Sequence, residues 1–434
     1  MNNHERPSMN SSHKISLKSA VLINLNIMAG AGIFVNVVDI TNALSTAGGL
    51  LYLLVGLFMF PLVFTFAKLV NIYPVGGFYA FAKPMSPFLG FFSNWTYFFG
   101  KLASASLLLY VAANFLKQLF PSALEQIDAL WLSMIILSFF IYLNFLNVRI
   151  GAMIQNCFFA AKSIPMLSMI ILGIYYFDIN IITSSSNLCP SAFIASLPLA
   201  LYCFSGFEAA CSISRQMHNP EKNAPKAIFY SFFSIILLYV AFQTLISMML
   251  MPNIESISSY TQAYPYFASL IPTTPWLQSK LATIITFLIG FSAMGAAYGL
   301  LFSNSWNLYT LAQNKHTFAH NKVSSLNQHN VPATAVLIEG LFCVFFLLAT
   351  NGNKTQLLQI STLGCTITYT ISTLAFLSLN KWSSITGLLS LITCSGFITA
   401  CIISSIKYNF VALHLLGIMM ALGAAMYYWC EKNR

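Results

Sequence analysis

One acidic residue, Glu208, lies inside an apolar segment that is long enough to cross a membrane. The stretch around it, L-Y-C-F-S-G-F-E-A-A (Leu201 to Ala210), also holds small residues and a glycine. A carboxylate at membrane depth is costly, so it usually faces a cavity and marks a functional site. Because burial disfavours the charged form of a carboxyl group, Glu208 could bind a proton. The alternative is a structural acid that is hydrogen-bonded between helices.

A second interruption, A-G-A-G-I-F (Ala29 to Phe34), lies in the first apolar segment. Unwinding a helix frees backbone N–H and C=O groups, and the N-terminus of a half-helix carries a partial positive charge. Two interrupted helices at corresponding places in two halves are typical of the binding site of a secondary transporter. Small residues that only allow close helix packing are the alternative interpretation.

The composition indicates the class of protein that must position these segments. Of the 434 residues, 58% are hydrophobic and only 7% are charged, whereas a soluble domain has roughly a quarter of its residues charged. The apolar runs are near the ~20 residues of a spanning helix and exceed the ~10 residues of a barrel strand. We therefore predict an all-α polytopic membrane protein in the cell inner membrane, with the lipid bilayer as its surroundings.

The net charge of +10 reflects topology and not nucleic acid binding, because Lys and Arg mark the cytoplasmic loops of membrane proteins. With the N-terminus inside, the inner side receives Arg6, Lys14, Lys18, Lys68, Lys83, Arg149, Lys162, Arg215, Lys222, Lys226, Lys315, Lys322, Lys381, Lys432 and Arg434. The outer side receives Lys117, Lys280, Lys354 and Lys407. This imbalance predicts that both termini are cytoplasmic.

The apolar pattern predicts about twelve spans. They are expected at 17–43, 48–71, 86–119, 129–147, 152–177, 192–214, 226–250, 280–311, 332–350, 356–379, 383–405 and 409–430. The first and sixth spans carry the interruptions, and this offset of five suits two inverted five-helix repeats. We expect a tail at 1–15 and one transmembrane domain at 16–434, with repeats at 17–177 and 192–379 and two extra helices at 383–430. Segment 251–279 should lie on the outer surface, and segment 312–331 should be cytoplasmic.

No residue pattern indicates an enzyme or a cofactor. The nine cysteines show no zinc-type spacing, and only Cys189 falls in an outer loop, so no disulfide is implied. His316 and His320 are four apart, but they lie in a polar loop without further ligands. The sequence contains no P-loop and no H-E-x-x-H motif. We predict neither metal nor cofactor.

Five motifs together resemble the amino acid–polyamine–organocation superfamily, most closely its basic amino acid and polyamine antiporter branch. They are N-I-M-A-G-A-G-I-F (Asn26 to Phe34), Y-P-V-G-G-F-Y-A-F-A (Tyr73 to Ala82), S-P-F-L-G-F-F-S-N-W (Ser86 to Trp95), F-S-G-F-E (Phe204 to Glu208) and N-P-E-K-N-A-P-K-A-I (Asn219 to Ile228). The resemblance implies ten core helices in two inverted halves, two further helices, and a substrate held between unwound parts of helices 1 and 6. An amino acid carboxylate suits the freed N–H groups, and its ammonium suits the freed carbonyls.

The resemblance also implies the substrate-binding residues. Gly30, Ala31, Gly32 and Ile33 should form the carboxylate cradle of helix 1. The unwound part of helix 6 should comprise Tyr202, Cys203, Phe204, Ser205 and Gly206, and Tyr202 could cover the substrate or simply pack. Tyr97 on helix 3 and Tyr298 on helix 8 are expected to add pocket aromatics.

Three ionisable residues could govern coupling and specificity. Glu208 and Lys162 are the candidate titrating pair, since a lysine at the Lys162 position replaces a sodium ion in some proton-coupled relatives. The alternative for Lys162 is a lysine that snorkels to the inner interface. Lys101 could repel a cationic side chain or attract an acidic one, or it could pair with Glu208 or Glu339.

We therefore expect a secondary active amino acid transporter that works by alternating access, with proton-coupled uptake or exchange, and not an enzyme. The alternatives are an amino acid/product antiporter and a transport-inactive nutrient sensor of the same fold. A homodimer is possible.

Overall fold

The computed structural model describes residues 14–181, 189–257, 259–408 and 410–433, apart from the side chains of Ala31, Lys407 and Tyr408. Within these residues the chain is mainly helical, with an isolated β-bridge between Ile15 and Met217. Most of the predicted tail at 1–15 lies outside the described residues.

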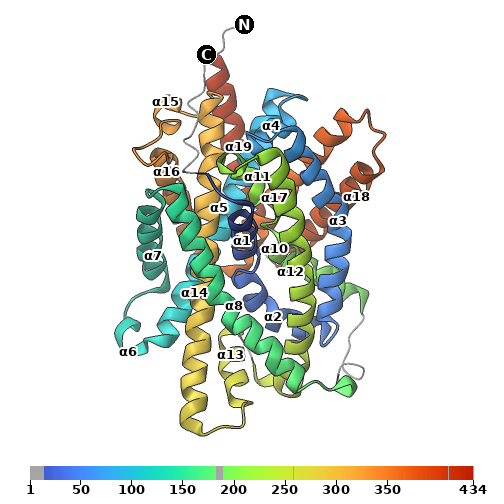
Figure 1. Ribbon diagram of the computed structural model, residues 1–434, viewed down its shortest axis with the longest axis vertical. Coiled ribbons are helices and arrows are strands. Elements are labelled where there is room, and N and C mark those ends of the chain that lie inside the picture. The colour runs from blue at the N-terminus through green and yellow to red at the C-terminus, as the bar shows by residue number, and fades with distance from the viewer. Residues whose placement is uncertain (1–13, 182–188, 258, 409, 434) are drawn as a thin grey trace.

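The helices form one upright bundle (Figure 1). They are α1 Leu17–Met28, α2 Ala31–Leu44, α3 Gly48–Ile72, α4 Gly77–Ala82, α5 Pro87–Leu119, α6 Pro121–Leu124, α7 Ala129–Asn144, α8 Val148–Tyr175, α10 Pro190–Phe204, α11 Ala209–Ser212, η2 Ser214–Gln216, α12 Pro220–Leu250, η3 Met251–Ser256, α13 Tyr260–Ser269, α14 Pro275–Gln313, α15 His320–Val323, α16 Ala333–Thr350, α17 Lys354–Leu379, α18 Ile385–Tyr408 and α19 Val411–Lys432. We call the end with α4, α15 and the last turn of α19 the upper end, and the end with α6 and α13 the lower end.

The predicted polytopic class is confirmed. Within the described residues, ten helices are long and apolar enough to cross a membrane, with α1 and α2 counted together, and α7 and α10 are shorter apolar helices. The exact number of twelve spans stays a prediction. A short helix, α13, occupies the segment that was expected between two spans at 251–279.

Local sequence explains where several helices begin. The side chains of Ser16, Asp128, Asn147 and Asn353 accept hydrogen bonds from the first turns of α1, α7, α8 and α17. Proline stands in the first turn of α5, α10, α12 and α14, where its missing N–H costs nothing. The span expected at 226–250 begins earlier than predicted, because α12 already starts at Pro220, inside the N-P-E-K-N-A-P motif.

Helices from the two halves of the chain pack in equivalent pairs. The helix α3 lies against α12, α5 against α14, and α7 against α16. Each pair joins a predicted span with the span five places later, which is the relation that a two-fold pseudo-symmetry would produce. The repeat boundaries themselves stay predictions.

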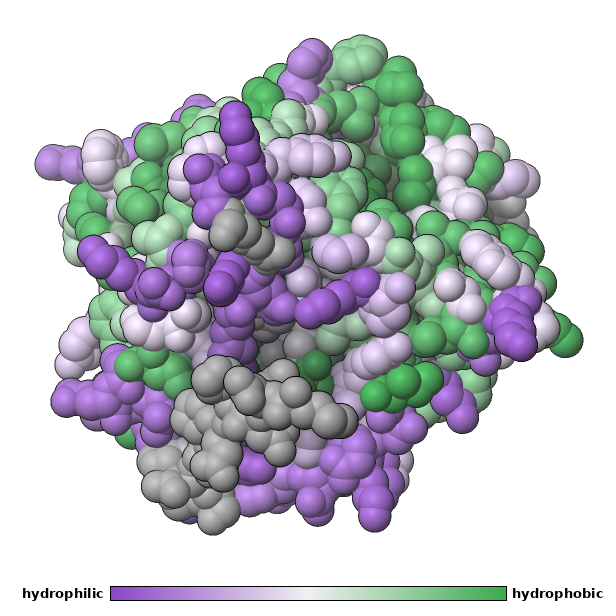
Figure 2. Space-filling view, turned by 90° about the horizontal axis from the view of Figure 1, so that it is seen from above, coloured by the Kyte–Doolittle hydropathy of each residue, from purple (hydrophilic) through white to green (hydrophobic). Residues whose placement is uncertain are grey.

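The outer surface of the bundle matches a lipid environment. Large apolar side chains such as Leu57, Trp131, Ile171 and Leu237 are more than half exposed. Figure 2 looks down on the upper end, where hydrophilic residues gather over the left, the middle and the bottom of the face, and hydrophobic residues dominate its top and right. A polar end and an apolar circumference are expected for a protein embedded in a bilayer.

Candidate substrate-binding site

The first span is broken between α1 and α2. Helix α1 ends at Met28, and Gly30 is extended (φ −72°, ψ −163°) before α2 begins at Ala31. The N–H groups in the first turn of any helix have no intrahelical acceptor. At the start of α2 no side chain caps them either. The backbone also approaches α14 closely, because a Cβ built on Gly30 would lie 2.6 Å from the Cβ of Ala296.

The second break lies between α10 and α11. Ser205 is extended (φ −66°, ψ 115°), and Gly206 has φ +139°, a conformation that is open almost only to glycine. Helix α11 starts at Ala209, after Glu208. We expected the unwound segment to start at Tyr202, but Tyr202, Cys203 and Phe204 form the last turn of α10.

The two breaks face each other. A Cβ on Gly32 would lie 3.2 Å from both the Cys203 sulfur and the Tyr202 ring, and one on Gly206 would lie 2.7 Å from Ile27. The hydroxyl of Tyr239, on α12, lies within hydrogen-bond distance of the carbonyls of Met28 and Cys203. One side chain therefore holds the ends of α1 and α10 together.

A small cavity lies between the breaks. It is lined by Ile27, Met28, Gly30, Gly32, Ser104, Leu108, Tyr202, Cys203, Ser205 and Leu300. Its volume of about 10 Å³ for the centre of a water molecule corresponds to about one water. The site is therefore nearly collapsed, and an amino acid could enter only if the surrounding helices move apart.

The structure brings together some of the expected binding residues at this cavity. Gly30, Gly32, Tyr202, Cys203 and Ser205 line it. The backbone of Ala31 and Ile33 belongs to the first turn of α2, and Gly206 lies in the opposite break. The side chain of Phe204 instead packs against Tyr52, Phe232 and Tyr239.

Two expected pocket aromatics do not line the cavity. Tyr298 lies on the far side of α14, where its ring is near Phe140, Phe158 and Phe302. Tyr97 packs against Phe78 in a tilted arrangement with ring centroids 4.1 Å apart, and it presents its ring to Lys101.

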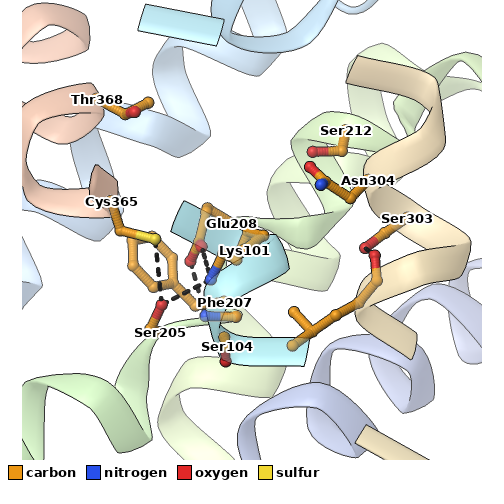
Figure 3. A network of polar contacts seen from close by, with 12 residues as sticks. Lys101, Ser104, Ser205, Phe207, Glu208, Ser212, Ser303, Asn304, Cys365 and Thr368 are labelled. Carbon is orange, nitrogen blue, oxygen red and sulfur yellow. Dashed lines mark hydrogen bonds and ion pairs between the residues drawn. The ribbon is translucent and has the colours of Figure 1, made fainter. Parts of the chain in front are cut away.

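Lys101 and Glu208 form an ion pair in the protein interior (Figure 3). The Nζ of Lys101 lies 2.7 Å from Oε1 of Glu208 and donates to the Ser205 hydroxyl at 2.6 Å. The second carboxylate oxygen, Oε2, accepts the N–H of Gly206 at 2.9 Å. Both side chains are at most 2% exposed. Of the partners considered for Lys101, the structure therefore selects Glu208 and not Glu339.

Lys162 is buried in a different place. Its ammonium donates to the carbonyl of Asn26, near the end of α1, at 2.7 Å, and the residue is 0% exposed. It makes no ion pair with any described residue. Lys162 is therefore buried and does not snorkel to the surface, and its ammonium forms no ion pair with Glu208 in the part of the chain that the structure describes.

The two ends of the bundle differ around this site. At the upper end, a vestibule of about 500 Å³ is bordered by α4, α11 and α14 and reaches Ser212 and Arg215. At the lower end, Lys354 on α17 pairs with Asp39 on α2 at 2.6 Å, and the Tyr264 hydroxyl of α13 donates to the Phe34 carbonyl. Figure 3 shows the Lys101–Glu208 pair between Ser205, beside the cavity, and Ser212, beside the vestibule.

Sequence reasoning missed Tyr239, Ser104 and Cys365. The Ser104 hydroxyl bonds to that of Tyr202 at 3.0 Å, and the Ser205 hydroxyl contacts the Cys365 sulfur at 3.7 Å. Each lies in a long helix that carries several other hydroxyl or amide side chains, so none of the three stood out in the sequence. Among the described residues, no group of three or more His, Cys, Asp or Glu side chains could hold a metal ion.

The chain is similar in sequence to known amino acid permeases and transporters. The chain is 25% identical to the amino-acid permease AapA of Bacillus subtilis over 67% of its own length and 63% of that protein, so the match spans just under two thirds of this relative. It is 25% identical to the aromatic amino acid permease FywP of Lactococcus lactis over 78% of each chain. It is 26% identical to the putrescine transporter PotE of Haemophilus influenzae over 53% of its length and 52% of that protein.

A family model described as amino acid permease matches residues 15–430. This range includes both broken spans, the cavity between them and the helices that pack around it. The chain belongs to the amino acid permease family.

Proposed function

We propose that this protein carries an α-amino acid across the cytoplasmic membrane by alternating access. The observation that supports this most directly is the pair of facing helix breaks around one small cavity. The uncapped N-terminus of α2 offers N–H groups and a partial positive charge to the substrate carboxylate. Carbonyl groups at the ends of α1 and α10 offer acceptors to its ammonium group.

The difference between the two ends supports alternating access. Of the two ends, the upper one has the vestibule, and the lower one has the Asp39–Lys354 pair across α2 and α17. Lys and Arg are concentrated in loops at the upper end, so the positive-inside rule favours that end as cytoplasmic. The described conformation would then be closed towards the outside, and opening would separate α2 from α17.

Lys162 is the proposed proton-coupling residue. Its ammonium holds the Asn26 carbonyl next to the first helix break, so a change of its charge would alter the position of α1. Uptake driven by a proton gradient is therefore the proposed mode. Exchange for an internal amino acid or product is the alternative, because the relatives include a putrescine transporter as well as permeases.

The experiment is uptake of labelled amino acids into proteoliposomes, with and without an inwardly directed pH gradient or an internal amino acid. Uptake that rises with the pH gradient supports proton coupling. Stimulation only by internal amino acid would overturn proton coupling and support exchange. Binding without flux of any compound would overturn transport and identify a sensor of the same fold.

A further inference from the structure

The cavity between the two breaks is uncharged. Among its lining residues, Leu108, Leu300, Ser104 and Tyr202 lie apart from the backbone breaks and would meet a substrate side chain. Two of these residues are aliphatic and two offer hydroxyl groups. Charged groups occur one step behind this wall, where Ser205 links the cavity to Lys101.

Both members of the ion pair are already engaged, with each other and with polar neighbours. The Lys101 ammonium has three protons, and it faces Glu208 at 2.7 Å, Ser205 at 2.6 Å and the ring of Tyr97 at 5.1 Å from its centroid. The Glu208 carboxylate contacts Lys101 with one oxygen and the Gly206 N–H with the other. The pair is neutral as a unit, and it offers no unoccupied charge to a substrate.

This arrangement discriminates between side chains by charge. A cationic side chain in the cavity would meet the ammonium of Lys101, while the carboxylate that could balance it is already occupied. An anionic side chain would have to draw Lys101 away from Glu208 and leave that carboxylate buried without its cation. A neutral side chain disturbs neither group.

We propose that Lys101 is a specificity-determining residue, which restricts the substrate to amino acids with uncharged side chains by occupying Glu208. The inference rests on the proposed transport function and narrows its substrate class. It has a reciprocal consequence. Removing Lys101 leaves a carboxylate next to the cavity, and this carboxylate would accept the ammonium group of a cationic amino acid or a diamine. Removing Glu208 would instead leave an ammonium that accepts an acidic side chain.

The test is competition against uptake of labelled alanine, serine, leucine or phenylalanine into proteoliposomes. Unlabelled lysine, 1,4-diaminobutane and glutamate are the charged competitors. Because like charges brought together are strongly disfavoured, lysine should compete with the wild-type protein at least about tenfold more weakly than neutral amino acids. If lysine competes as well as alanine, the inference is overturned while the transport function stands. If no amino acid is transported, the proposed function itself fails.

The variants test the mechanism. Lys101→Met should raise competition by lysine and 1,4-diaminobutane at least about tenfold, and Glu208→Gln should do the same for glutamate. The double variant Lys101→Met/Glu208→Gln removes both charges and should restore neutral preference, so it remains informative if a single variant does not fold. Lys117→Met, in the last turn of the same helix, is the matched control. Folded Lys101→Met protein with the wild-type order of competitors would refute the proposal.

Discussion

Replacing Gly206 with alanine is a direct test of the break between α10 and α11. Gly206 has φ +139°, and its backbone lies against the end of α1. An alanine at this position adds only one methyl group. It nevertheless challenges both the backbone conformation and the contact between the two breaks, on which the proposed site depends.

The magnitude follows from two costs. Holding a non-glycine residue in this region of φ and ψ costs about 1–3 kcal/mol. The new methyl group would lie 2.7 Å from Cγ2 of Ile27 and 3.1 Å from Cγ of Met28, and such overpacking costs about 1–3 kcal/mol. We therefore expect Gly206→Ala to lower the free energy of unfolding by about 2–6 kcal/mol and to abolish transport.

Two matched variants separate the causes. Gly30→Ala retains an ordinary φ of −72° but places its methyl group 2.6 Å from Ala296, so it adds overpacking without backbone strain. Gly417→Ala lies in α19, where a new Cβ has no neighbour within 4 Å. Alanine is favoured over glycine in a helix by up to about 1 kcal/mol, so this variant should be neutral or slightly stabilised.

Thermal unfolding can be followed with a thiol-reactive fluorophore, because unfolding exposes cysteines that are buried in the native protein. We expect the melting temperatures to fall in the order Gly417→Ala, Gly30→Ala, Gly206→Ala, with uptake lost at least in the last. If Gly206→Ala melts and transports like Gly417→Ala, the break does not require a left-handed glycine and the reasoning is refuted.

Three further predictions use residues in or near the site. Because Cys203 lines the cavity, a small thiol reagent should inhibit uptake, substrate should slow this inhibition, and Cys203→Ser should resist it; inhibition without substrate protection would contradict the cavity assignment. Hydrogen bonds from the Ser191 hydroxyl and from nearby backbone N–H groups lower the pKa of Cys189. More thiolate is therefore present at neutral pH, and an impermeant maleimide should label intact cells at Cys189, more slowly after Ser191→Ala; labelling only after permeabilisation would reverse the assigned orientation. Lys162→Met should remove the stimulation by a pH gradient, and undiminished stimulation would exclude Lys162 as the proton-coupling residue.

The membrane spans and the existence of two breaks could be predicted from the sequence. Long apolar runs must be helical in a bilayer, because no other open structure satisfies the backbone there. The interruptions were visible as glycine and an acid within such runs. The extent of the second break was not predictable. Tyr202 to Phe204 remain helical, and the turn instead needs the positive φ of Gly206.

The position of Tyr298 shows why side-chain facing was harder to predict. Successive residues on a helix are about 100° apart, so neighbouring positions contact different helices. Gly299 faces Ile27 of α1, whereas Tyr298 faces Phe140 of α7 and Phe158 of α8. Helix α14 is apolar on most sides, so its sequence gives no polar face from which the orientation could be read. Without that signal, a shift of one residue in alignment changes the predicted neighbour completely.

The buried lysines could be located in helices from the sequence, but their roles depend on contacts between distant segments. Lys101 faces a carboxylate, so the loss of its proton would leave Glu208 charged and unpaired in the protein interior. Lys162 faces a backbone carbonyl and has no ion-pair partner among the described residues, so the loss of its proton breaks no ion pair. The two lysines are therefore suited to different tasks. We therefore expect Lys101 to fix the charge beside the cavity, and Lys162 to be able to change its charge at the end of α1 without disturbing that specificity.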